Sequence, residues 1–158
     1  MMRMPIAIAL TLAISVVLAR AQSPTTPAPD EVGDAAVRFM AVDLFIDTAD
    51  AGLAAYQVDI RDLSGRATIA GIEGGAVDTF RAPPYYDPAA LHSEGRIVLA
   101  AFTTDDNTPA GKSRVARLHF QIHGEPPADF DIQLIVAADS DGAVIDATPS
   151  IVAAPAGA

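Results

Sequence analysis

Two histidines lie on one predicted strand, where they could bind a metal ion or a partner. His119 and His123 are four residues apart, so on an extended chain they share a face and stand about 13 Å apart at roughly 3.3 Å per residue. A metal ion needs its ligands about 2 Å away, so the pair does not form a metal site. With Arg117 and Gln121 the histidines form a polar stripe, which fits a solvated sheet face or a face that binds a partner.

The acidic turn at residues 139–142, with the sequence DSDG, invites comparison with a calcium loop. The EF-hand pattern places a glycine at position 6 and a carboxylate at position 12. Counted from Asp139, these positions hold Val144 and Ser150, so the pattern fails and the motif predicts a hairpin turn. The remaining metal hypothesis is a loose calcium site on one of two carboxylate groups: Asp139, Asp141 and Asp146, or Asp105 and Asp106.

Two adjacent tyrosines, Tyr85 and Tyr86, lie in the proline-rich loop Pro83–Pro88. They cannot both point inward from an extended segment, because successive side chains point to opposite faces. An exposed tyrosine stacks on a sugar or anchors a protein contact, so the pair is the predicted site for a carbohydrate ligand. The alternative is a stiff crossover with one tyrosine packed at the domain edge. The chain has no tryptophan and three tyrosines, which argues against a platform for crystalline polysaccharide.

Motifs for covalent or phosphoryl chemistry are absent from the sequence. The chain has no cysteine and no Gly-x-Ser-x-Gly elbow. The glycine-rich run GIEGG at 71–75 is too short for a phosphate loop and lacks its Lys and Ser/Thr. We therefore expect a protein that is not an enzyme and that uses no cofactor and no metal.

The elements that must position these residues are β-strands. Apolar and polar residues alternate in four segments, which predicts strands with one face on a core. A fifth segment, Arg96–Thr104, is apolar on both faces and predicts a central strand, and Ala67–Ile72 predicts a weaker one. Turn sequences separate the segments, and no helical period exceeds two turns, although Tyr85–Leu91 allows one short turn. The four alternating segments are Val42–Asp47, Ala54–Arg61, Arg114–His123 and Phe130–Ala137.

The alternation also assigns side chains to faces. In Arg114–His123 it places Phe120 and its alternate neighbours inward. It places Val115, Arg117, His119, Gln121 and His123 outward. In Phe130–Ala137 the alternation places four side chains on one side of the strand: Phe130, Ile132, Leu134 and Val136. Short strands with this pattern predict one all-β sandwich.

The ends of the chain predict export. Residues 1–21 combine Arg3, an apolar run of about 14 residues and the small-residue site Ala19-Arg20-Ala21, the pattern of a signal peptide cut before Gln22. The run is short of the roughly 20 residues that span a bilayer, so we expect no membrane insertion after cleavage. We expect a Pro/Thr/Ala-rich linker at 22–36, one domain at 37–151 and a flexible tail at 152–158.

The net charge of the chain limits the classes of partner that it is expected to bind. Cleavage before Gln22 removes Arg3 and Arg20 and no acid, so ten Lys+Arg fall to eight against twenty Asp+Glu and the net charge moves from −10 to −12. Such a protein repels nucleic acid and anionic lipid. Basic protein surfaces, calcium-bearing proteins and neutral sugars remain as partners.

The order of these segments resembles that of the cohesin family. The resemblance covers nearly all of residues 37–151 and rests on five segments in order: GLAAYQVDIRD (52–62), ATIAGIEGG (67–75), GRIVLAAFT (95–103), VARLHFQIHG (115–124) and FDIQLIVAADSDGAVI (130–145). It implies a jelly-roll β-sandwich of about nine strands, the fold that cohesins share with some carbohydrate-binding modules.

The resemblance also implies a function. Cohesins bind dockerin modules of other secreted proteins through the outward face of the sheet that holds the GLAAYQVDI-like strand. In cohesins Asn and Asp lie on that face, and the matching positions here are Ala55 and Gln57. If Leu53–Arg61 and Arg114–His123 lie in one sheet, their outward residues form a contiguous patch with a low spot at Ala55 and Arg117 as its main anchor. That predicted patch is Ala55, Gln57, Asp59, Arg117, His119 and Gln121.

Three functions follow as hypotheses for a secreted protein, whether periplasmic or extracellular. The first is a cohesin-like module that binds an extracellular protein of dockerin type. The second is a module that binds polysaccharide, for which Tyr85 and Tyr86 are the predicted site. The third is an exported structural or adhesion domain.

Overall fold

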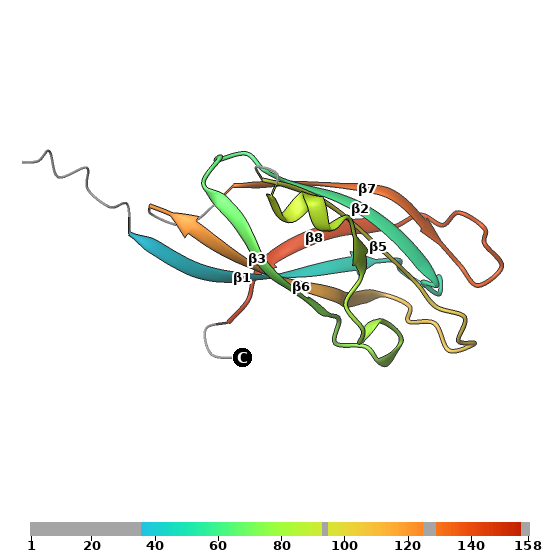
Figure 1. Ribbon diagram of the computed structural model, residues 1–158. Coiled ribbons are helices and arrows are strands. Elements are labelled where there is room, and N and C mark those ends of the chain that lie inside the picture. Colours follow the sequence, from blue (N-terminus) through green and yellow to red (C-terminus); the bar gives the residue numbers. More distant parts are fainter. Residues whose placement is uncertain (1–35, 93–94, 125–128, 156–158) are drawn as a thin grey trace, which may run out of the picture. The chain divides into compact units, whose positions relative to one another are not determined.

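The computed structural model describes residues 36–92, 95–124 and 129–155. The predicted signal peptide, most of the linker and the last three residues lie outside these ranges. The described chain forms eight strands and two short 3₁₀ turns, η1 and η2 (Figure 1). The elements are β1 (Val37–Asp47), β2 (Ala55–Asp62), β3 (Ala67–Gly74), η1 (Asp78–Phe80), β4 (Tyr85–Tyr86), η2 (Pro88–His92), β5 (Arg96–Phe102), β6 (Lys112–His123), β7 (Phe130–Ala138) and β8 (Thr148–Ala153).

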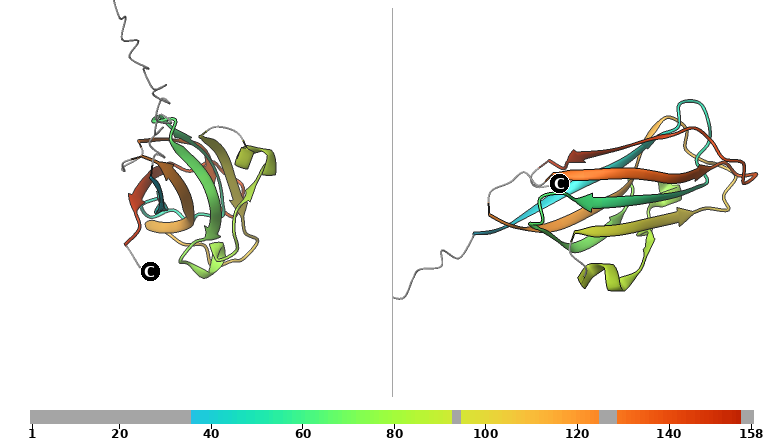
Figure 2. Two further views of the ribbon diagram at one scale, coloured as in Figure 1. Left: turned by 60° about the vertical axis from the view of Figure 1, so that its left-hand side comes forward. Right: turned by 90° about the horizontal axis from the view of Figure 1, so that it is seen from above.

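The strands form two antiparallel four-stranded sheets. The first sheet has the order β3-β6-β1-β8 and the second has the order β4-β5-β2-β7. The two sheets lie one over the other as the layers of a sandwich (Figures 1 and 2). The predicted all-β jelly-roll sandwich is therefore confirmed, with eight strands in the described ranges where about nine were expected.

The core lies between the sheets and consists of the inward alternate residues of each strand. Phe120 is buried, as predicted, and its ring centroid lies 4.6 Å from that of Phe130. Burying each large aliphatic side chain favours folding by about 1.5–3 kcal/mol, so this double layer is the main source of stability. The largest side chains that are almost wholly buried include Leu44, Ile46, Val58, Ile60, Leu99, Leu118 and Ile122.

Two β-bulges correct the predicted faces. In β6 the pairing with β1 passes from Ala116 to Arg114, so Val115 is the extra residue and is buried rather than outward. In β7 the pairing with β2 passes from Val136 to Leu134, so Ile135 is extra and Val136 turns to the outer face. A bulge adds one residue to one strand, and beyond it the inward and outward positions exchange.

The sheet order shows that the predicted binding patch is not contiguous. β2 belongs to the second sheet and β6 to the first. The outward residues of β2 (Ala55, Gln57 and Asp59) and those of β6 (Arg117, His119 and Gln121) therefore lie on opposite outer faces of the sandwich. Within each strand these residues occupy the outward positions, as predicted, but the alternation along a strand does not determine which sheet the strand joins.

Among the helical turns of the described ranges, none is long and apolar enough to cross a membrane.

Candidate functional site

The outer face of the second sheet, named here the β2 face, is built from four rows of paired residues. The rows follow from the registers of β2 with β5 and β7 and of β4 with β5. The first two rows are mainly apolar and the last two are mainly polar or charged. From one end of the face to the other the rows are Phe102–Ala55–Ala138, Tyr85–Ala100–Gln57–Val136, Val98–Asp59–Gln133 and Arg96–Arg61–Asp131.

The apolar half of the β2 face exposes three large side chains. Tyr85 is 70% exposed, Phe102 is 64% exposed and Ile135 is 49% exposed. The rings of Tyr85 and Phe102 are nearly parallel, at 14°, with centroids 6.2 Å apart. Beside these side chains the paired rows hold the small residues Ala55, Ala100 and Ala138, with Gln57 at the centre of the second row.

The two tyrosines divide as the extended geometry requires. Tyr85 points outward, and Tyr86 is partly buried against the core. The prediction that one tyrosine packs at the edge of the sandwich is therefore confirmed. Of the predicted pair, only Tyr85 contributes to the exposed aromatic surface.

The charged half of the β2 face centres on Asp59. Arg96 donates to its carboxylate through Nε and Nη2, at 3.0 and 2.8 Å, and Arg61 Nη2 donates at 2.8 Å. These hydrogen bonds, first from Arg96 and then from Arg61, lower the pKa of Asp59 to about 2. Asp59 is buried beneath the two half-exposed arginines, so the arginines rather than the carboxylate face the solvent.

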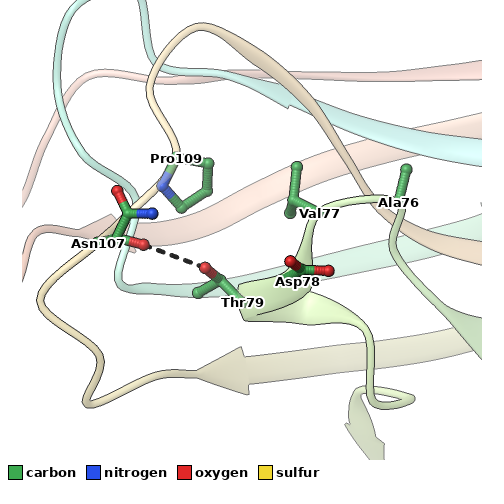
Figure 3. Close-up of a pocket in the computed structure, with 6 residues that line it drawn as sticks. All are labelled: Ala76, Val77, Asp78, Thr79, Asn107 and Pro109. Atoms are coloured by element: carbon green, nitrogen blue, oxygen red, sulfur yellow. Dashed lines mark hydrogen bonds between the residues drawn. The ribbon is translucent and has the colours of Figure 1, made fainter.

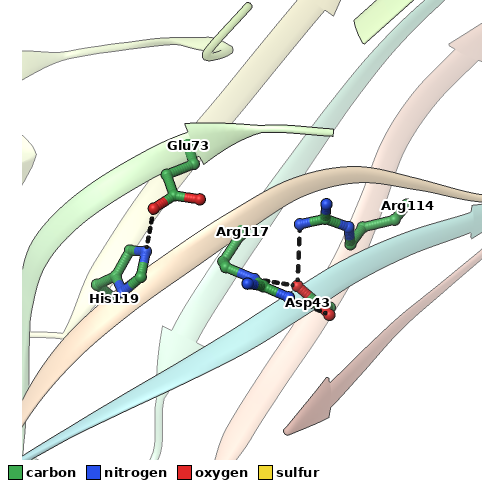
Figure 4. A network of polar contacts seen from close by, with 5 residues as sticks. All are labelled: Asp43, Glu73, Arg114, Arg117 and His119. Atoms are coloured by element: carbon green, nitrogen blue, oxygen red, sulfur yellow. Dashed lines mark hydrogen bonds and ion pairs between the residues drawn. The ribbon is translucent and has the colours of Figure 1, made fainter. Parts of the chain in front are cut away.

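The outer face of the first sheet, the β6 face, holds the other half of the predicted patch, of which Figure 4 shows Arg117 and His119. Arg117 donates to Asp43 through Nε at 2.7 Å and Nη2 at 3.1 Å, and Arg114 joins the same carboxylate at 3.3 Å. The side chain of Arg117 is 12% exposed. It cannot serve as the predicted anchor without breaking this ion pair.

The histidine stripe on the β6 face is also engaged. His119 Nε2 lies 2.8 Å from a carboxylate oxygen of Glu73, and the Gln121 amide lies 3.3 Å from the ring of His123. Neighbouring side chains therefore partner the polar groups of this face, which is the pattern of a solvated surface.

A pocket lies between the segment that carries η1 and the loop between β5 and β6 (Figure 3). Thr79 Oγ1 crosses it to donate to the carbonyl oxygen of Asn107, at 3.2 Å. Its one charged residue, Asp78, is paired with Arg81. A small-molecule site needs several polar groups that converge on the ligand, and this pocket lacks them. Its lining is Ala76, Val77, Asp78, Thr79, Asn107 and Pro109.

The acidic turn is a hairpin turn, as predicted. Asp139 Oδ1 accepts hydrogen bonds from the backbone N–H groups of Asp141, at 3.0 Å, and Ala143, at 2.9 Å. Gly142 has a φ of +79°, which glycine adopts without strain. Within the part of the chain that the structure describes, no three His, Cys, Asp or Glu side chains are grouped to hold a metal.

Two residues of the β2 face escaped the sequence prediction. Phe102 ends a segment that is apolar on both faces, and this double character was a signal that one side would be exposed or covered by a partner. Ile135 lies outward by the simple alternation of Phe130–Ala137, and it was overlooked because that segment was examined for its inward residues.

The fold resembles solved cohesin structures, although the sequence matches no known family. No protein-family model matches the chain, and no curated protein matches it in sequence. The complex of CaDoc0917 with CaCohA2, a module from Clostridium acetobutylicum, matches with a TM-score of 0.54 and 16% identity, over 69% of this chain and 82% of the matched one. A non-cellulosomal cohesin from Archaeoglobus fulgidus matches with a TM-score of 0.51 and 13% identity, over 68% and 72% of the two chains. The resemblance to cohesins is thus confirmed at the level of the fold.

Proposed function

We propose that this chain is an exported, non-catalytic module that binds a protein partner of dockerin type through its β2 face. The observation that carries the proposal is the exposed apolar group of Tyr85, Phe102 and Ile135 on the sheet that contains β2. The cohesin fold supports a protein partner, since one of the matched cohesin modules is in complex with a dockerin. The signal-like residues 1–21 support export.

The shape of the β2 face supports a macromolecular partner. It is an open sheet surface, whereas small molecules prefer concave pockets. Phe102 and Ile135 lie on β5 and β7, on either side of β2 and two strand spacings apart, or about 10 Å. An α-helix with its side chains is about 10 Å wide, so an amphipathic helix laid along the face reaches both side chains. Ala55, the low spot predicted from the sequence, lies on β2 between these two strands.

The proposal is tested by replacing the exposed apolar side chains. We expect the double variant Tyr85→Ser/Phe102→Ser to lose at least tenfold in affinity for a partner isolated from the secretome or from a panel of dockerin modules, because exposed aromatics at an interface centre are common hot spots. The matched control is His119→Ala/Gln121→Ala, which changes two residues of the opposite face. If the control loses affinity while the aromatic variant binds normally, the β2 face is not the site.

A second candidate function is carbohydrate binding, and one observation favours it. The exposed rings of Tyr85 and Phe102 are nearly parallel, as in surfaces that stack against sugar rings. Retention on insoluble polysaccharide tests this function directly. Loss of retention in the Tyr85→Ser/Phe102→Ser variant, with no protein partner captured by the same preparation, would favour the carbohydrate reading over the protein one.

A further inference from the structure

The apolar end of the β2 face is surrounded by acidic loops. β2 begins at Ala55, β5 ends at Phe102 and β7 ends at Ala138, so the loops 48–54, 103–111 and 139–147 all emerge beside the first row of the face. These loops lie at one end of the sandwich (Figure 1). They contain no Lys or Arg. Their acids are Asp50, Asp105, Asp106, Asp139, Asp141 and Asp146.

Two of these carboxylates are available to a partner. Asp105 and Asp106 are exposed, and within the described ranges their carboxylates form no hydrogen bond and no ion pair. The nearest base along the chain is Lys112, whose ammonium lies over the ring of Phe45, 5.0 Å from its centroid, on β1. One ammonium does not balance the six carboxylates of the three loops, so this end keeps a net negative charge.

The far end of the β2 face is less acidic. Its last two rows hold Asp59 and Asp131 beside Arg61 and Arg96, so their formal charges cancel. Beside these rows the described residues add Asp62 and Asp129 against Arg66. The face consequently has a direction: apolar with strongly negative surroundings at one end, and closer to neutral at the other. A flat apolar surface alone does not orient a ligand, but this charge asymmetry does.

We infer that the β2 face binds an amphipathic protein segment whose apolar side meets Tyr85, Phe102 and Ile135 and whose Lys or Arg residues are gathered at the end that meets Asp105 and Asp106. The inference rests on the proposed function and adds the chemistry and the direction of the partner. A second copy of this chain does not fit, because it would bring a net charge of −10 toward the same acidic loops.

The test uses two synthetic amphipathic helical peptides with the same leucine stripe. Lysines occupy the polar positions of one terminal turn in the first peptide and glutamates occupy them in the second. We expect the full-length protein to bind the lysine peptide about three- to tenfold more tightly in low salt, with the difference reduced in high salt, as for exposed ion pairs. Asp105→Asn/Asp106→Asn should remove most of that preference.

The matched control removes two acids that lie outside the β2 face, Glu73 on the β6 face and the exposed Asp129. Glu73→Gln/Asp129→Asn has the same net charge as the test variant, so it should keep the preference if the position of the charge matters. Equal binding of both peptides, or equal loss in the two variants, would overturn the inference. So would a preference that survives Tyr85→Ser/Phe102→Ser, since the peptide would then be held by the loops alone. Binding of neither peptide also overturns it, while the partner screen continues to decide the proposed function.

Discussion

Asp59 shows how one polar residue on an outer face becomes structural. It lies among the outward positions of β2, yet Arg96 and Arg61 cover it and lower its pKa to about 2, from an ordinary value of 3.8. A carboxylate whose pKa is lower in the folded state than in the unfolded state stabilises the fold above the unfolded value. Its contribution is lost as the pH falls through the folded value.

We expect Asp59→Asn to lower the free energy of unfolding at neutral pH by about 1–2 kcal/mol, because the arginine partners are half exposed and solvent screens them. The difference between wild type and variant should shrink as the pH falls from about 4 to about 2, the window between the two pKa values. Urea denaturation across this range measures it. Asp105→Asn is the control, and a difference that does not depend on pH would contradict the assignment.

Phe120 is a residue of the core whose contribution to stability can be tested in the same way. Phe120→Ala should reduce the free energy of unfolding by about 3–5 kcal/mol, the usual effect of deleting a buried phenylalanine. Phe39→Ala, on the neighbouring strand, removes a ring that is 74% exposed and should change stability by less than about 0.5 kcal/mol. Similar effects of the two substitutions in chemical denaturation would mean that Phe120 is not central to the core.

At the scale of the elements, β-bulges and close backbone contacts decide which side chains of a strand face the core and which face the solvent. The bulge at Val115 brings a second apolar side chain inward, and the hydroxyl of the buried Tyr56 donates to the Val115 carbonyl at 3.3 Å. Burial raises the pKa of Tyr56. The bulge at Ile135 turns Val136 to the β2 face as well, beside the exposed Ile135. Neither irregularity disturbs the pairing of the flanking residues.

Two glycines of β3 provide a test at this scale. A Cβ at Gly74 would overlap the backbone carbonyl of Arg81, whereas a Cβ at Gly71 would meet only His119 Cδ2, at 4.0 Å. We expect Gly74→Ala to destabilise the protein by about 3 kcal/mol, since the backbone must move. Gly71→Ala should be tolerated within about 1 kcal/mol. Thermal unfolding of the two variants measures the contrast, and equal melting temperatures would show that the Gly74 contact relaxes freely.

At the scale of the whole molecule, the sandwich has two outer faces, and strands that follow one another in the sequence contribute to opposite faces. The polar side chains of the β6 face form ion pairs and hydrogen bonds with one another, and Val37, Phe39 and Val152 are exposed on the same face. The β2 face instead groups a nearly parallel pair of exposed aromatic rings with the exposed Ile135. Because a protein interface excludes water around a few large side chains, the second surface is the better candidate for binding.

Export is the prediction that concerns the complete chain. We expect the exported protein to begin at Gln22, because small residues at Ala19 and Ala21 precede it. Intact-mass measurement and N-terminal sequencing of protein recovered outside the cytoplasm check this expectation. Exported protein that still begins at Met1, or a form that is extracted only with detergent, would contradict it.

Local patterns in the sequence determined most of the fold. Alternation of apolar and polar residues predicted the strands, the buried Phe120 and the division of Tyr85 from Tyr86, because side-chain direction in a strand depends on position alone. The turn at Asp139–Gly142 followed from residues that favour its backbone conformation. Only the tertiary structure decided which strands share a sheet, and so separated Ala55 and Gln57 from Arg117. It also decided the bulges and the burial of Asp59, because pairing across long stretches of chain depends on contacts that no local pattern records.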